Sequence, residues 1–225
     1  MDANVELQRR IATIALSVVS DSGFALAGGA ALREHGISTR PTQEIDLFRR
    51  IGDRGTFLDA VTKVSSVLKD HGFAVAIVQL ADTGSFARLH VDDATGDSVE
   101  IDMGEDYRSS PPVPLDVGPV LSRDDIIGAK FATACMRTYT RDLIALDHIR
   151  QASNYTDREL YRIAAATDPG ITPGLFRQRI EIVSMIDQAE FDEYGVTVGQ
   201  RQAIEGRLRG FVASLRRIEN ETTLP

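Results

Sequence analysis

The chain has 225 residues, of which 43% are hydrophobic and 26% are charged, and its formal net charge is −8. This length suits one large domain or two small ones, and the composition is ordinary for a globular protein. Its one cysteine, Cys135, excludes an internal disulfide framework and fits a reducing compartment. No apolar run is long enough to span a bilayer, so we expect a cytoplasmic protein without a membrane partner.

The acidic charge balance argues against a protein that coats nucleic acid, since such proteins are usually basic overall. If the chain binds nucleic acid, a local patch has to do so. An acidic chain also agrees with carboxylates clustered at a metal ion, or simply with a solvated surface.

The first part of the sequence predicts helices and strands in alternation. An apolar face at helical spacing predicts a helix over Val5–Val19. The apolar run Phe24–Ala27, the pair Gly28-Gly29 and the helix-prone segment Ala30–His35 predict a strand, a glycine turn and a short helix. Alternation with period two predicts a strand over Glu44–Phe48.

A helix and three closely spaced strands follow. Thr56 is a predicted N-cap for a helix that ends at His71-Gly72. Strands are predicted over Phe73–Leu80, Phe86–Val91 and Val99–Met103. The short turns between these strands predict antiparallel pairing.

The segment Ser109–Pro114 is the richest loop signal in the chain, and it places a domain boundary shortly afterwards. We therefore expect an α/β (α+β) domain over residues 1–120 and a helical domain over residues 121–225. From residue 122 onward only helices are predicted, with start signals at Ser122, Thr156, Thr172 and Thr197.

The glycine pair is the first of three features that suggest chemistry. Without side chains, Gly28 and Gly29 allow a phosphate to approach the backbone at the start of a helix. A tight turn with positive φ explains an isolated glycine pair equally well.

Two strands supply paired carboxylates. Alternation places Glu44 and Asp46 on one face, and likewise Glu100 and Asp102. A solvated acidic strand is the simpler explanation for either pair alone. If the strands are neighbours, Asp102 joins Glu44 and Asp46 in a site for one or two divalent cations, or it acts as a general base towards an attacking hydroxyl.

The three features resemble a known family when taken in order. The segments Leu26–Leu32 and Arg40–Phe48 (RPTQEIDLF) resemble the AbiEii/AbiGii (MenT-like) nucleotidyltransferases, whose members pair with an antitoxin in bacterial toxin–antitoxin and phage-defence systems. Asp125–Lys130, then Arg137, then Arg141-Asp142-Leu143, resemble the family's helix with a lysine and an R-D motif. Phe191–Gly195 is a looser match to its C-terminal region.

The resemblance implies a nucleotidyltransferase-type mixed sheet with flanking helices, followed by an all-helical domain. It implies a metal-dependent toxin that uses Mg²⁺ or Mn²⁺ and transfers NMP from an NTP to an acceptor hydroxyl, with the acceptor end of tRNA as acceptor and an antitoxin as partner. The residues that it implies for metal binding and catalysis are Glu44, Asp46, Asp102 and Lys130, and those for nucleotide binding are Gly28, Gly29, Arg40, Lys130 and Arg141.

Three positions depart from the family pattern. Glu44 lies where aspartate is usual, Ala30 where many members have Ser or Thr, and Ala145 where a second acid is expected three residues after Asp142. Asp142 or Asp147 would have to substitute as the supporting acid, although a helix turns these two side chains to different faces. These departures leave open a binding module of the same fold with weakened chemistry; a small-molecule nucleotidyltransferase is a further alternative.

Basic residues near these motifs have two interpretations. In an unbroken helix, Lys130, Arg137 and Arg141 would line one face that clamps a triphosphate or follows an RNA backbone. A solvated basic face is the alternative. Among the arginines near the glycines, Arg40 is the best candidate for a phosphate contact, because Pro41 stiffens the backbone next to it.

Overall fold

The computed structural model describes residues 3–53, 55–152 and 154–222. The chain divides into two compact units, Met1–Ile126 and Ile127–Pro225. Each unit has its own core and is described by itself.

The first unit is built on a seven-stranded mixed sheet with the strand order β3-β4-β5-β2-β1-β7-β6. The β2–β5 and β1–β7 pairs are parallel, and the other neighbours are antiparallel. This confirms the predicted mixed sheet and the antiparallel β3, β4 and β5. The strands are β1 (Ala25–Leu26), β2 (Glu44–Arg50), β3 (Ala74–Leu80), β4 (Phe86–Asp92), β5 (Ser98–Asp106), β6 (Val113–Leu115) and β7 (Gly118–Val120).

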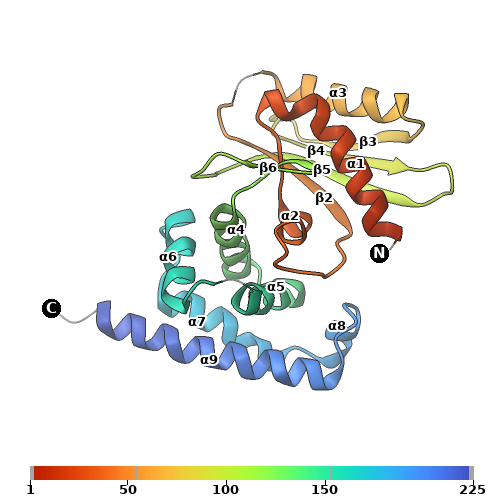
Figure 1. The fold of residues 1–225 in the computed structure, drawn as a ribbon. Helices are drawn as coiled ribbons and strands as arrows, with labels where there is room; N and C mark the ends of the chain where they lie inside the picture. The colour runs from red at the N-terminus through yellow and green to blue at the C-terminus, as the bar shows by residue number, and fades with distance from the viewer. Residues whose placement is uncertain (1–2, 54, 153, 223–225) are drawn as a thin grey trace. The chain divides into compact units, whose positions relative to one another are not determined.

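Helices cover this sheet. Helices α1 (Ala3–Val19) and α3 (Phe57–Asp70) pack against each other on one side of the sheet, and α2 (Gly28–Glu34) lies on the other (Figure 1). A short 3₁₀ helix, η1 (Ser20–Ser22), follows α1. The predicted N-cap of α3 is present, since the Thr56 hydroxyl accepts a 3.1 Å hydrogen bond from the Asp59 N–H. Apolar side chains from these helices and from the strands form a buried core.

Two short strands were missed by the sequence prediction. β6 and β7 lie in and just after the segment that the prolines marked as a loop. β6 is at the edge of the sheet, where Pro114 is tolerated because one side of the strand has no neighbour to which an N–H must donate. β7 pairs with β1, so this segment completes the sheet beside the glycine turn.

The second unit is helical throughout its described residues. Helix α4 (Arg123–Met136) leads into it from the first unit, and the helical start signals at Ser122, Thr156, Thr172 and Thr197 each accept the expected backbone N–H. The other helices are α5 (Thr140–Ala152), α6 (Asp157–Thr167), α7 (Pro173–Glu181), η2 (Ile182–Met185), α8 (Gln188–Asp192) and α9 (Val198–Thr222).

An aromatic cluster forms the centre of this helical unit. Phe131 of α4, Phe176 of α7 and Phe211 of α9 are fully buried, and their ring centroids lie 4.9 to 5.9 Å apart. Helix α9 presents a buried stripe to the core at helical spacing. The stripe consists of Ile204, Leu208, Phe211, Leu215 and Ile218.

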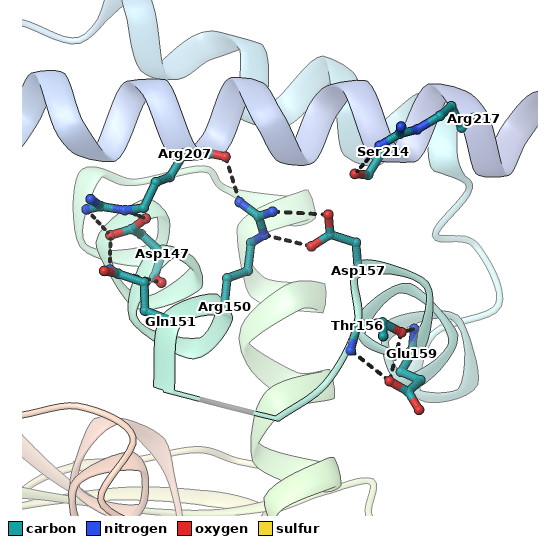
Figure 2. Close-up of polar contacts among 9 residues, drawn as sticks. All are labelled: Asp147, Arg150, Gln151, Thr156, Asp157, Glu159, Arg207, Ser214 and Arg217. Carbon is teal, nitrogen blue, oxygen red and sulfur yellow. Dashed lines mark hydrogen bonds and ion pairs between the residues drawn. The ribbon is translucent and has the colours of Figure 1, made fainter.

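Two ion pairs join α5 to its neighbours (Figure 2). Asp147 is 1% exposed and accepts two hydrogen bonds of 2.7 Å from Arg207 of α9, together with one from Gln151. Arg150 donates to both carboxylate oxygens of Asp157 on α6 and to the carbonyl oxygen of Arg207. These contacts join α5 to α6 and to α9, and of the charged side chains involved Asp147 is the buried one.

The prediction of one basic face over Lys130, Arg137 and Arg141 is wrong, because the helix is not continuous. α4 ends at Met136 and α5 begins at Thr140. Between them Thr138 has φ 51°, in the left-handed region that β-branched residues avoid. This break separates Lys130 on α4 from Arg141 on α5, so helical periodicity does not align them.

Candidate active site

A face with four carboxylates crosses the middle of the sheet. In the parallel pairing of β2 with β5, Glu44 lies opposite Glu100 and Asp46 lies opposite Asp102. Paired residues of neighbouring strands lie about 4.8 Å apart and project from the same face. The alternate residues Ile45, Leu47, Ile101 and Met103 are fully buried on the other face. The sequence predicted the two carboxylate pairs, and the strand order brings them together.

The glycine turn lies directly against Asp46. The Ala27 N–H donates a 2.8 Å hydrogen bond to the Asp46 carbonyl oxygen, which extends the β1–β2 pairing to the start of α2. Gly28 has φ 61°, and a Cβ there would lie 1.7 Å from Oδ2 of Asp46. Only glycine satisfies both conditions. The backbone of α2 therefore begins in van der Waals contact with this carboxylate.

Gly29 brings the predicted phosphate contact, Arg40, close to the turn. A Cβ on Gly29 would lie 2.5 Å from Cγ2 of Thr42 and 3.8 Å from Nη2 of Arg40. The N-cap residue of α2, Ala27, makes no side-chain capping hydrogen bond. Gly28, Gly29, Arg40 and Asp46 thus form one locus, with backbone and guanidinium donors beside a carboxylate.

Arg88 is a site residue that the sequence analysis missed. It lies on β4 opposite Asp102, and its Nε and Nη2 donate hydrogen bonds of 2.6 and 2.7 Å to the two oxygens of the Asp102 carboxylate. Its Nη1 lies 3.4 Å from Oε2 of Glu100. The alternation of polar and apolar residues along β4 could have placed Arg88 and His90 on the polar face of the sheet. The sequence alone does not show that β4 pairs with β5.

The charge on Arg88 is fixed by these neighbours. The hydrogen bonds to Asp102 raise the pKa of Arg88 above its ordinary value, and the negative charges of Asp102, Glu100 and Glu44 act in the same direction despite some loss of solvation. The guanidinium therefore remains a permanent cation within the acidic face.

The carboxylates on β2 are of the kind that a hard divalent cation binds. Mg²⁺ takes one or two carboxylates and completes its octahedral shell with phosphate oxygens and water. Glu44 and Asp46 supply two carboxylates on one strand face, and the Asp46 carboxylate lies directly against the backbone of Gly28. In the described parts of the chain, no three His, Cys, Asp or Glu side chains form a group ready to hold a metal ion. Arg88 pairs with Asp102, and the role of Asp102 as a metal ligand or general base stays a prediction.

The remaining predicted residues lie in the helical unit. Lys130 is on α4 and is half-buried. Arg141 begins α5, and its guanidinium carbon lies 5.8 Å from the centre of the Tyr139 ring. Asp142 is 1% exposed and accepts hydrogen bonds from Arg137 and from the Tyr139 N–H. Asp142 therefore joins the two sides of the α4–α5 break, and its role as a supporting acid stays a prediction.

Two of the positions at which this chain departs from the family pattern are buried. Ala30 is 3% exposed in the first turn of α2, and Ala145 is 4% exposed on α5. Both methyl groups pack without polar atoms that would need partners.

Comparison with family models identifies the class of protein. The model described as "Nucleotidyl transferase AbiEii toxin, Type IV TA system" matches residues 15–209. The chain belongs to this family of nucleotidyltransferase toxins. A search of curated protein sequences found no match.

Solved structures share the fold over nearly the whole chain. JHP933 from Helicobacter pylori has a TM-score of 0.63 at 11% identity, with 99% of this chain and 97% of that chain covered. A putative nucleotidyltransferase from H. pylori has a TM-score of 0.61 at 14% identity, covering 98% and 97%. MenT4, a nucleotidyltransferase toxin from Mycobacterium tuberculosis, has a TM-score of 0.63 at 17% identity, covering 99% and 85%.

Among the helices of the described residues, none combines the length and apolar character needed to cross a membrane.

Proposed function

We propose that this nucleotidyltransferase toxin transfers NMP from an NTP to a hydroxyl group at the acceptor end of tRNA, in a reaction that needs Mg²⁺ or Mn²⁺. The observation that carries the proposal is the contact of Asp46 with the side-chain-free turn at Gly28. Such a turn places backbone donors and a metal-binding carboxylate within reach of the same triphosphate.

Each residue has a role in this proposal. Glu44 and Asp46 would hold the metal ion, which when bound supplies charge neutralisation on the triphosphate. Gly28 and Gly29 give the phosphates access to the backbone, and Arg40 donates to a phosphate oxygen. Lys130 and Arg141, in the helical unit, are the further cations that we assign to the nucleotide. We assign nucleotidyl transfer to residues 1–120 and a supporting role to residues 121–225.

The chemistry is an in-line displacement. The acceptor oxygen forms a bond to the α-phosphorus, the bond from that phosphorus to the pyrophosphate oxygen breaks, and the hydroxyl proton passes to water. Most of the rate enhancement in such a reaction comes from positioning and from stabilisation of charge. The named side chains would position the substrate and stabilise its charge without forming a covalent bond to it.

A partner protein follows from the family. Since the chain belongs to a toxin family of toxin–antitoxin systems, we propose a cognate antitoxin and a site of action in the cytosol, where NTP and tRNA are found.

A nucleotide-binding module of the same fold is the second candidate. The bidentate contact between Arg88 and Asp102 favours this candidate, because a two-metal site would need the Asp102 carboxylate that Arg88 binds. Such a module would bind NTP with Mg²⁺ and transfer nothing.

The discriminating experiment offers each α-labelled NTP to the protein with total RNA, with and without Mg²⁺. We expect metal-dependent labelling of tRNA-sized RNA. Metal-dependent NTP binding without labelled RNA would favour the binding module, and labelling of a small molecule in a cell extract would favour the small-molecule transferase.

A further inference from the structure

Two phenylalanines lie on the same face of the sheet as the carboxylates. The β2–β5 and β4–β5 registers are continuous, and they place Phe48 opposite Gly104 and Gly104 opposite Phe86. Phe48 follows Asp46 by two residues, so it projects from the same face about 6.6 Å further along the strand. Both rings are half-buried, whereas the neighbouring Leu47, on the opposite face, is fully buried.

The absence of a side chain at Gly104 lets both rings lie over one point of the sheet. A Cβ on Gly104 would lie 3.2 Å from Cε1 of Phe48 and 3.7 Å from Cδ2 of Phe86. The backbone of Gly104 is part of β5 and is not in the left-handed region. The close packing of the rings therefore accounts for glycine at this position. We call Phe48, Phe86 and Gly104 the aromatic platform.

The aromatic platform adjoins the locus that we assign to the phosphates. Asp46 lies against Gly28 and pairs with Asp102, and the next pair along the same face is Phe48 with Gly104. In a nucleotide, one ribose ring separates the base from the α-phosphate. The two-residue rise of about 6.6 Å from Asp46 to Phe48 is comparable with that separation. A nucleotide with its α-phosphate at Asp46 thus has a base within reach of the rings.

We propose that the aromatic platform binds a nucleobase by stacking, beside the metal ion and the phosphates of the same reaction. This inference rests on the proposed function and deepens it, because it names the place of a substrate base. Every nucleobase presents a π-face, so stacking on phenylalanine tolerates any base. The NTP and the end of the RNA acceptor both carry such a base, and the experiment below distinguishes these two sources.

The alternative is a purely structural role for the rings. A ring that covers a glycine of the neighbouring strand stabilises a sheet without any ligand. That alternative predicts that changing Phe48 lowers the unfolding temperature and leaves every ligand affinity unchanged. A stacking role predicts a loss of affinity that is confined to ligands with a base.

Equilibrium binding to the full-length protein in the presence of Mg²⁺ separates the two explanations. The probes are a non-hydrolysable ATP analogue, inorganic triphosphate and a single-stranded RNA oligonucleotide. We expect Phe48→Leu and Phe86→Leu to bind one or both of the base-containing probes roughly tenfold more weakly, the scale of one lost stacking contact. Their affinity for inorganic triphosphate should match wild type. A loss confined to the ATP analogue identifies the NTP base, and a loss confined to the RNA identifies the acceptor base.

Phe73→Leu is the matched control for the loss of a ring. Phe73 is buried just before β3, and its ring contacts the guanidinium of Arg10 on α1. This variant should bind all three probes like wild type. A loss of affinity for the ATP analogue in Phe73→Leu as large as that in Phe48→Leu would count against the aromatic platform.

A tryptophan in the aromatic platform reports the contact directly. The chain has no tryptophan, so Phe48→Trp yields a protein with a single indole at this place. A base stacked on the indole should quench its fluorescence, and inorganic triphosphate should leave it unchanged. This variant keeps an aromatic ring, so it decides the question if the leucine variants fail to fold.

Three results overturn the inference. One is a folded Phe48→Leu protein that binds both the ATP analogue and the RNA as tightly as wild type. Another is an equal loss of affinity for inorganic triphosphate, which would show a general disturbance of the site. The third is a Phe48→Trp protein whose fluorescence neither base-containing probe changes.

The binding measurements do not depend on the transfer reaction. A wild-type protein that binds the probes but labels no RNA loses the proposed activity and leaves the comparison among the variants intact. A wild-type protein that labels tRNA, while the leucine variants keep full affinity for every probe, retains the proposed function and refutes the aromatic platform. A wild-type protein that binds neither base-containing probe refutes both.

Discussion

Asp46 and Asp102 are direct neighbours in the parallel β2–β5 pairing, but their surroundings differ. Asp46 lies against Gly28, where a Cβ would come within 1.7 Å of its Oδ2. Asp102 lies under the guanidinium of Arg88. Asp46 thus packs against the backbone at the start of α2, whereas Asp102 pairs with a guanidinium from the neighbouring strand β4.

Replacement of Gly28 tests the close approach to Asp46. Gly28→Ala should cost about 1–3 kcal/mol of folding free energy from the left-handed backbone, and it should displace the Asp46 carboxylate. Gly36→Ala is the matched control, because Gly36 has φ 69° but open space around its missing Cβ. It should cost about 1–2 kcal/mol and leave Mn²⁺ affinity unchanged. Equal Mn²⁺ affinities in the two variants would refute the role of the turn.

Glu44→Asp tests whether the site keeps the family geometry. The change withdraws the carboxylate by roughly 1.5 Å, the length of one C–C bond. If Mg²⁺ is held as in relatives with aspartate here, the transfer rate should stay the same or rise. Glu100→Asp, on the same face, should have little effect. A large loss of rate in Glu44→Asp alone would show a site built around glutamate.

The ion pair between the buried Asp147 and Arg207, whose side chain is 39% exposed, should contribute more to the stability of the helical unit than an exposed ion pair does. Arg207→Met leaves the Asp147 carboxylate, which is 1% exposed, without its main partner and should cost about 3 kcal/mol in denaturant unfolding. Arg209→Met, in which the side chain is 68% exposed and pairs with Glu205, should cost less than about 1 kcal/mol. Similar costs for the two variants would contradict this assignment.

Cys135 should be inert in the folded protein. Burial raises the pKa of its thiol to about 12, so the reactive thiolate is scarce at neutral pH. Iodoacetamide at pH 8 should label the native protein far more slowly than the denatured one. Because the unfolded thiol loses its proton at lower pH than the folded one, this group should also reduce stability as the pH rises from about 9 towards 12. Rapid native labelling would show an accessible thiol.

Period-two alternation was sufficient to predict the carboxylate pairs on β2 and β5, because it depends only on neighbouring residues. The order of the strands depends on contacts between distant residues, so the pairing of Asp102 with Arg88 could not be predicted. The break at Thr138 was hidden for a different reason. Thr138 is β-branched and such residues disfavour the left-handed region, so its φ of 51° could not be expected from the sequence.

The most direct test of the account is the rate at which Asp46→Asn transfers labelled NMP to RNA in the presence of Mg²⁺, compared with wild type. Asp82→Asn, an exposed residue in the turn between β3 and β4, is the matched control. The account predicts a loss of at least about 100-fold for Asp46→Asn, the scale set by the removal of one transition-state contact, with wild-type activity in the control. Transfer by a folded Asp46→Asn protein at the wild-type rate would contradict it.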